Sequence, residues 1–314
     1  MTVGSDELDR AEGMGSRDPV DERKKESQAT RLVGLAADAD LFHTSKGVAY
    51  ATIAVGHHTE THLLNSKGFR RWLARRFFEA EGGAPGSQAI QDALGVLEGM
   101  ALFAGVERDV YVRLAEHAGA IYLDLGDSSW DAIEITRAGW ELCAKPPVRF
   151  RRPGGMAALP RPARGGSIED LRPFLNPADE RDWVLTTTWL VTALRPRGPY
   201  PALNLTGEQG TGKSTEARVL RELVDPNAAE LRSEPREVRD LMIAATNAWI
   251  LALDNLSHIS PWLSDALCRL ATGAGSPPGS STRMTKRSSS TRSDRSSSPG
   301  SKSSPPAGIC STAW

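Results

Sequence analysis

A glycine-rich segment at residues 207–214 has the residue types and spacing of a phosphate-binding loop. It reads Gly-Glu-Gln-Gly-Thr-Gly-Lys-Ser and fits the pattern G-x-x-x-x-G-K-[ST] at every fixed position. Glycines let successive backbone N–H groups curl around phosphate oxygens, and a following helix presents its positive N-terminal end to the same anion. In this pattern Lys213 reaches the β- and γ-phosphates and Ser214 binds Mg²⁺. The phosphate-binding residues of the predicted ATP and Mg²⁺ site are Gly207, Glu208, Gln209, Gly210, Thr211, Gly212, Lys213, Ser214 and Thr215.

A second motif supplies the acid that such a loop requires. The apolar run at 249–253 ends in Asp254, 40 residues after Ser214. In P-loop nucleotide sites an acid at this place holds Mg²⁺, so the predicted metal ligands are Ser214 and Asp254. Asn255 follows, where many ATPases carry a glutamate that orients the attacking water. Because an asparagine cannot take the proton of that water, either the base lies elsewhere or hydrolysis is slow. The predicted catalytic residues are Lys213, Asp254 and Asn255.

The elements around these motifs alternate between strand and helix. The residue before the helix at 177–194 is Asn176, a good cap, and Pro177 suits the first helical position. Such alternation is typical of a parallel α/β sheet. We therefore predict a P-loop NTPase parallel sheet over residues 167–273, incomplete at its C-terminal end. The pattern predicts strands at 200–205 and 249–253 and helices at 177–194, 213–224, 235–245 and 261–271.

A smaller α+β domain of unknown role is predicted before this sheet, over residues 31–150. Residues 1–30 have almost no large apolar side chains and are expected to be a disordered arm. Residues 151–166 are rich in Pro, Gly and Arg and are expected to be a linker. The α+β pattern consists of a strand at 48–55, helices at 69–79 and 87–102, and strands at 109–114, 120–125, 132–135 and 140–142.

The composition changes abruptly after Gly273. Residues 276–314 hold 14 Ser and 5 Pro, with six Lys and Arg against one Asp, whereas the rest of the chain has 32 basic and 38 acidic residues. A basic disordered linker that binds nucleic acid non-specifically is one interpretation of 274–314. The interpretation that we favour is a frameshift, because codons for Val, Ile, Leu and Phe ending in T-C become serine codons when read one nucleotide late. The runs 288–290 and 296–298 would then replace buried strands, and the tail could not fill the sheet.

The composition and the cysteine count exclude several classes of protein. The chain has 314 residues with a formal net charge of −1, and 39% of its residues are hydrophobic. Its three cysteines, Cys143, Cys268 and Cys310, are too few for a disulfide framework and fit a reducing compartment. No apolar run approaches the roughly 20 residues that cross a bilayer. We expect a cytoplasmic protein that does not interact with membranes.

Three longer stretches resemble ATP-binding proteins of bacteria and their phage- and plasmid-like mobile elements, which are often related to primase–helicase ATPases. The stretches are GGSIEDLRPFLN at 165–176, PYPALNLTGEQGTGKST at 199–215 and LALDNLSHISPWLSDALCRLATG at 251–273. The short gap between the two motifs also resembles superfamily III helicases. The resemblance implies an ATPase with helicase-type activity in DNA metabolism, with single-stranded DNA as a partner. It also implies a ring-type homo-oligomer, although this chain lacks the strand with the sensor residue and the later intersubunit arginine.

Several weaker candidates lie outside the two motifs. His57, His58 and His62 could bind a metal, but an exposed polar loop is the favoured interpretation. His258 could sense the γ-phosphate, or it could be a loop histidine without a catalytic role. Arg269 could contact a nucleotide or a neighbouring subunit, or it could be an ordinary cation at a helix end. Arginines on the helix at 69–79 could contact nucleic-acid phosphates beside Trp72, Phe77 and Phe78, or could form a solvated face. These arginines are Arg70, Arg71, Arg75 and Arg76.

Two other functions remain open from the sequence. A catalytically silent protein that binds nucleotide or DNA would keep the loop but lack turnover. A small-molecule kinase would use the same loop, but no acceptor-binding constellation is visible. A GTPase and a transporter-type ATPase are disfavoured because the N-K-x-D and L-S-G-G-Q-like motifs are absent from the sequence.

Overall fold

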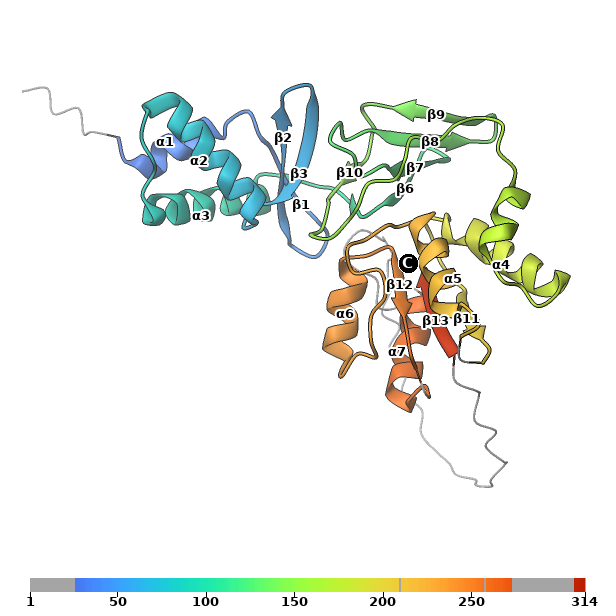
Figure 1. Cartoon of the computed structure of the whole chain (residues 1–314). Helices are drawn as coiled ribbons and strands as arrows, with labels where there is room; N and C mark the ends of the chain where they lie inside the picture. The colour runs from blue at the N-terminus through green and yellow to red at the C-terminus, as the bar shows by residue number, and fades with distance from the viewer. Residues whose placement is uncertain (1–25, 209, 257, 273–307, 314) are drawn as a thin grey trace, which may run out of the picture.

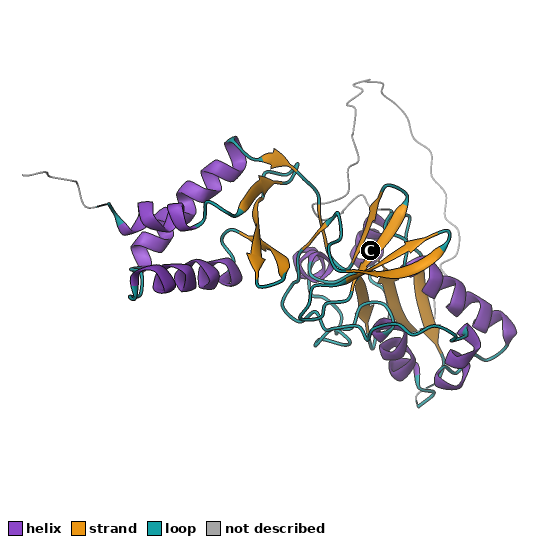
Figure 2. Cartoon of the chain, turned by 90° about the horizontal axis from the view of Figure 1, so that it is seen from above, coloured by secondary structure: helices purple, strands orange, loops and turns teal. Residues whose placement is uncertain are grey.

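The computed structural model describes residues 26–208, 210–256 and 258–272, together with the backbone of 308–313. Figures 1 and 2 show helices α1, α2 and α3 at one end of the molecule beside the first strands, with the other helices and sheets at the opposite end. The expectations for residues 1–25, for Gln209 and for the serine-rich stretch 273–307 lie outside the described residues.

The first body is a four-stranded sheet packed with three helices. Its strand order is β3-β2-β1-β4, in which β1, β2 and β3 are antiparallel and β4 runs parallel to β1. The core includes Phe69, Leu73 and Phe77 of α2, which lie at helical spacing on one face. The elements are α1 (Gln28–Leu35), β1 (Asp40–His43), β2 (Ala49–Val55), β3 (His58–Leu63), α2 (Lys67–Glu81), α3 (Ser87–Phe103) and β4 (Val106–Glu107).

Two expectations for this body are corrected. The arm does not extend to residue 30, because α1 begins at Gln28, where the Ser27 side chain accepts the Thr30 N–H and Leu32 enters the core. The histidine-rich segment is not a loop but strand β3, which pairs with β2. Thr61 of β3 is buried and its hydroxyl lies 3.0 Å from that of Thr52, so this polar strand packs against β2 through a hydroxyl pair.

The second body begins with two small sheets. One is a four-stranded antiparallel meander in the order β6-β7-β8-β9, and the other pairs β5 with β10 in parallel. The single strand expected at 109–114 is divided, because Arg113 has a positive φ of 65° between β5 and β6. The elements are β5 (Val110–Tyr111), β6 (Leu114–His117), β7 (Ala120–Asp124), β8 (Ala132–Thr136), β9 (Gly139–Cys143) and β10 (Arg149–Phe150).

The remaining elements surround a three-stranded sheet in the order β11-β13-β12. β13 is antiparallel to both neighbours, so β11 and β12 run in the same direction. The expected parallel sheet is therefore mixed. The prediction that the tail cannot fill this sheet is wrong for 308–313, which occupies the central position. The elements are η1 (Ile168–Phe174), α4 (Glu180–Ala193), β11 (Ala202–Thr206), α5 (Lys213–Glu222), α6 (Val238–Thr246), β12 (Ile250–Leu253), α7 (Pro261–Ala271) and β13 (Gly308–Ala313).

Two helices of this part begin later than expected. α4 begins at Glu180, because the Asp179 side chain, and not Asn176, accepts a backbone N–H at its start. α6 begins at Val238, because the preceding chain first lies along β12 through a parallel bridge between Arg232 and Leu253. This single bridge places the segment before α6 beside the end of β12.

One hydrophobic core joins the meander to the three-stranded sheet. It includes Leu123 and Leu125 of the meander region together with Trp189, Leu241 and Leu251. Residues 151–166, expected to be a linker, contribute to this packing, since Leu159 belongs to the same core. The domain boundary predicted at residue 150 is therefore wrong. The meander shares a core with the sheet of β11 and β12, whereas α1–α3 and β1–β3 form a separate core.

Candidate functional site

The glycine-rich loop connects the end of β11 to the first residue of α5. Gly207, Gly210 and Gly212 have φ values of 153°, 88° and 83°, a backbone region that side chains disfavour. A Cβ at Gly207 would lie 3.0 Å from the Thr211 hydroxyl oxygen. Gly212 is the N-cap of α5 and offers no side-chain acceptor to the first backbone N–H groups of the helix. The loop therefore has the backbone shape and the helix start that suit an anion.

The side chain of Lys213 folds back over this loop. Its Nζ donates to the carbonyl oxygens of Gly207 at 2.9 Å and Glu208 at 2.6 Å. The Thr211 hydroxyl donates to the same Glu208 carbonyl at 2.9 Å. The ammonium group is thus held inside the curve of the loop, where an anion bound by the backbone N–H groups would meet it.

Ser214 and Asp254 are brought together across the sheet. The Ser214 hydroxyl donates to Oδ1 of Asp254 at 3.2 Å, and the backbone N–H of Asn255 donates to the same oxygen at 2.8 Å. The two residues meet because β11 and β12 run in the same direction, so that the chain leaves both strands at one edge of the sheet. Asn255 has a positive φ of 57°, and its side chain is exposed. A hydroxyl and a carboxylate oxygen in contact are ligands that Mg²⁺ prefers.

Two residues that the sequence did not assign to the site support this arrangement. The Asn176 side-chain amide donates to the Thr211 carbonyl oxygen at 3.2 Å, which ties the segment before α4 to the loop. Arg232 accepts the Asp254 N–H with its carbonyl oxygen at 2.8 Å and donates its own N–H to Ala252 at 3.0 Å. From the sequence alone, Asn176 is predicted only as a helix cap, and no pattern indicates that Arg232 lies beside Asp254.

Glu216 lies one turn into α5 and is the titratable group nearest the loop with a shifted pKa. Burial raises the pKa of its carboxyl group, the backbone N–H of Asn176 acts in the opposite direction, and the charge of Asp182 adds to the rise. The loop is thus flanked by a partly buried carboxyl group whose pKa is raised.

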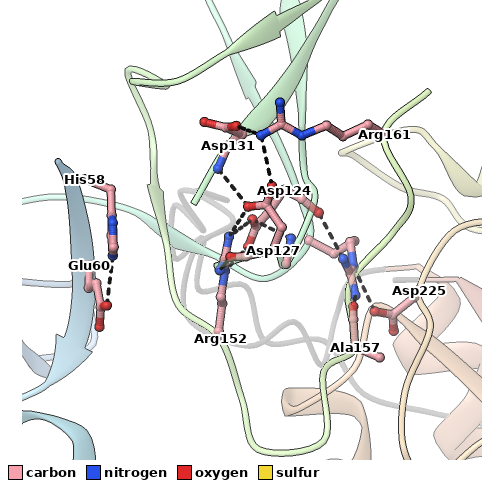
Figure 3. A network of polar contacts seen from close by, with 11 residues as sticks. His58, Glu60, Asp124, Asp127, Asp131, Arg152, Ala157, Arg161 and Asp225 are labelled. Atoms are coloured by element: carbon pink, nitrogen blue, oxygen red, sulfur yellow. Dashed lines mark hydrogen bonds and ion pairs between the residues drawn. The ribbon is translucent and has the colours of Figure 1, made fainter. Parts of the chain in front are cut away.

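Asp225 is a third residue that the sequence did not single out, and it connects the site to the rest of the protein. Its Oδ2 accepts the backbone N–H groups of Trp249 at 2.7 Å and Ile250 at 3.0 Å, where β12 begins. Its Oδ1 accepts the Nε of Arg113 from the meander region at 3.1 Å. Figure 3 shows Asp225 beside Ala157, whose carbonyl oxygen also accepts from Arg113. One buried carboxylate therefore joins the end of α5, the start of β12 and the meander region.

The histidine cluster is not part of this site. Nε2 of His58 lies 3.0 Å from one Glu60 oxygen and Nε2 of His62 lies 2.7 Å from the other, and these contacts lower the pKa of Glu60, the His62 hydrogen bond most. His57 is exposed in the turn before β3. Among the described residues, no group of three or more histidine, cysteine, aspartate or glutamate side chains could hold a metal ion.

The four arginines of α2 are divided among different contacts. Arg70 donates to Gln91 at 3.4 Å, Arg75 donates to Glu79 at 2.7 Å, and Arg76 donates to Asp38 at 2.9 Å. Arg71 is exposed. All four lie in the first body, away from the glycine-rich loop, as Figure 1 shows for α2 and α5.

The remaining candidates are on the surface of the second body. His258 and Arg269 are both exposed, the first after Asn255 and the second in the last turn of α7. Cys143 and Cys268 are free thiols. In the part of the chain that the structure describes, no helix has the length and apolar character of a membrane span.

The segment that holds the site matches a known family model. Residues 168–279, a little over a third of the chain, match the model of the actinomycete integrative conjugative element replication protein. The segment is similar to a mobile-element replication protein. The matched range contains the glycine-rich loop, Asp254 and Asn255. No curated protein and no solved structure matches the chain.

Proposed function

We propose that the chain is a P-loop ATPase that binds ATP and Mg²⁺ and acts on single-stranded DNA during replication of a mobile element. The observation that carries the proposal is the 3.2 Å hydrogen bond from Ser214 to Asp254, which unites the two motifs at one edge of the sheet. The match to a replication protein of an integrative conjugative element supports the role in DNA metabolism.

The residues of the loop and of the β12 end suit ATP and Mg²⁺. The backbone of the loop, Lys213 and the start of α5 would hold the phosphates, with Lys213 exchanging the carbonyl oxygens of Gly207 and Glu208 for phosphate oxygens. Ser214 and Asp254 would hold Mg²⁺. When bound, this ion would neutralise negative charge on the phosphates. Asn255 would orient a water molecule through its side-chain amide.

A silent nucleotide-binding protein is the second candidate, and Asn255 favours it. An asparagine side chain does not accept a proton from water at neutral pH, so an ATPase that relies on it needs a base from another segment. Measurement of single-turnover hydrolysis with and without single-stranded DNA separates the candidates. DNA-stimulated hydrolysis supports the ATPase, whereas ATP binding without hydrolysis in either condition supports the silent protein.

Titration of the purified chain with ATP and Mg²⁺ tests the site. Lys213→Ala removes a charge-assisted contact, so the affinity for ATP should fall by about 10- to 150-fold, which corresponds to about 1.5–3 kcal/mol. Arg218→Ala is the matched control, because Arg218 lies on the same helix but pairs with Glu230 at 3.1 Å. Equal affinity of wild type and Lys213→Ala would refute the assignment of this loop.

A further inference from the structure

A cleft lies between the first body and the meander region, remote from the glycine-rich loop in the sequence. Its volume is about 690 Å³, and its walls come from the β2–β3 turn, α2 and the loop between β7 and β8. This volume falls in the range of ligand sites, roughly 300–1,000 Å³. The lining residues with polar side chains are His57, His58, Arg75, Ser128, Ser129 and Asp131.

The lining is partly apolar, and most of its polar side chains carry hydrogen-bond donors. Arg75 uses its Nε for Glu79, which leaves its two terminal nitrogens for other partners, and its side chain is 74% exposed. Ser128 and Ser129 are exposed and contribute hydroxyl groups. Of the four arginines on α2, Arg75 is the one that lines the cleft. These groups suit a ligand that is rich in acceptors and negative charge.

The acidic groups on the meander side of the cleft are paired with arginines. Asp131, the acid in the lining, accepts a hydrogen bond from Arg161, whose guanidinium also lies 3.6 Å from Asp127. Asp124 forms two hydrogen bonds with Arg152, at 2.6 Å and 3.0 Å. Figure 3 shows this chain of carboxylates and guanidinium groups on one side, with His58 and Glu60 opposite. On the meander side, an anion entering the cleft would therefore meet carboxylates that already have arginine partners, whereas Glu60 opposite them is held by His58 and His62.

The wall of the cleft is held in a fixed and strained conformation. Trp130, between the lining residues Ser129 and Asp131, has a positive φ of 59°, which is uncommon for a large side chain. The guanidinium of Arg152 lies 3.9 Å from the centre of the Trp130 ring, and the His58 ring stacks with it at 6.3 Å. Strained residues persist where the surrounding structure fixes them, and they cluster at ligand sites.

We propose that this cleft binds the sugar–phosphate backbone of single-stranded DNA, with Arg75 as the principal phosphate contact. The inference rests on the proposed action on DNA but not on ATP binding. A cleft of about 690 Å³ has room for a short stretch of single strand but cannot enclose a double helix. A strand in the cleft would touch both bodies of the protein at once.

Fluorescence anisotropy with a labelled single-stranded oligothymidylate, in the absence of nucleotide and Mg²⁺, tests the inference on the full chain. Arg75→Ala should weaken binding roughly tenfold, the effect of one charge-assisted contact. The slope of log affinity against log salt should fall by about 0.7, the value for one phosphate contact on a single strand. Arg71→Ala is the matched control, since Arg71 is an exposed arginine on the same helix outside the cleft lining.

The outcomes separate this inference from the proposed function. Equal affinities of wild type and Arg75→Ala, equal losses in Arg75→Ala and Arg71→Ala, or equal competition by duplex DNA would each overturn the inference. A double variant, Ser128→Ala with Ser129→Ala, tests the cleft wall opposite α2. Its affinity for the oligothymidylate should also be lower than that of the wild type. The wild type could fail to bind ATP while Arg75→Ala still weakens DNA binding. That result would refute the proposed ATPase and support the cleft assignment.

Discussion

Arg113 donates its Nε to a carboxylate oxygen of Asp225 at 3.1 Å, and both side chains are at most 1% exposed. The same guanidinium donates to the carbonyl oxygens of Asp124 at 2.9 Å and Ala157 at 2.8 Å. Burial lowers the pKa of Arg113, and the charges of Asp225 and Asp124 oppose that shift. Because Asp225 also holds the first N–H groups of β12, this ion pair fixes the meander region against the strand that leads to Asp254.

Arg113→Ala should destabilise the protein by about 3–5 kcal/mol, since it leaves the Asp225 carboxylate buried without its counter-charge. Urea unfolding measures the loss. Arg197→Ala is the control, because Arg197 pairs with Glu116 at the surface with 77% of its side chain exposed, and such pairs contribute about 0–1 kcal/mol. Similar unfolding free energies for the two variants would contradict the role of the buried pair.

Asp254→Asn should remove the Mg²⁺-dependent part of ATP binding, because the amide oxygen can still accept from Ser214 but carries no charge. We expect ATP affinity at saturating Mg²⁺ to fall about tenfold or more. Without Mg²⁺ the affinity should not fall, since a negative charge near the phosphates has been removed. Calorimetric titration with and without Mg²⁺ measures both values. Asp240→Asn, an exposed acid on α6, should change neither.

Glu216→Gln should stabilise the chain at neutral pH and have little effect near pH 4. The folded state raises the pKa of Glu216 above its ordinary value of 4.5, chiefly through burial. The folded state therefore binds more protons than the unfolded state above pH 4.5, and stability is lost as the pH rises through the folded pKa. Glutamine removes that loss and can keep the Asn176 hydrogen bond. Thermal unfolding of both proteins between pH 4 and 8 checks the prediction, and a melting temperature difference independent of pH would contradict it.

Removal of residues 274–314 should destabilise the sheet that holds the site. Gly308–Ala313 pairs with β11 on one side and β12 on the other, so its loss leaves backbone N–H and C=O groups of both strands without partners. Amide hydrogen exchange should become faster in 202–206 and 250–253, and not in β1 and β2 of the first body. Unchanged exchange in β11 and β12 would show that the tail does not hold this position in solution.

The origin of the tail has its own test. If a frameshift occurs near 273–275, the gene read in the other frame should encode an apolar strand over the positions of Ser296–Ser298 and an arginine-bearing segment beyond it. Restoration of that frame should raise ATP turnover, because the restored chain supplies the sensor residue and the intersubunit arginine, which contributes about 10³–10⁵ in rate in related NTPases. A locus with no such alternative frame would favour a genuine linker.

The sequence by itself determined the local features of the site. The fixed spacing of Gly207, Lys213 and Ser214 specifies a loop before a helix, because glycine conformations and helix starts depend on neighbouring residues alone. The apolar run before Asp254 likewise identified β12, and most helices of the first body were predicted within two or three residues of their ends. These are elements whose apolar spacing is clear within one segment.

The tertiary structure alone decided which distant residues meet. Asn176 contacts the loop, Arg113 contacts Asp225, and Arg232 lies beside Asp254. Each contact joins segments that are distant in the sequence, and no local pattern indicates that they lie close together in space. The polar strand at His58 was missed because pairing with β2 and the shared Glu60 carboxylate, and not apolar alternation, hold it in place. The central place of β13 was missed for the same reason: strand pairing uses backbone groups that every residue carries, so side-chain composition does not reveal it.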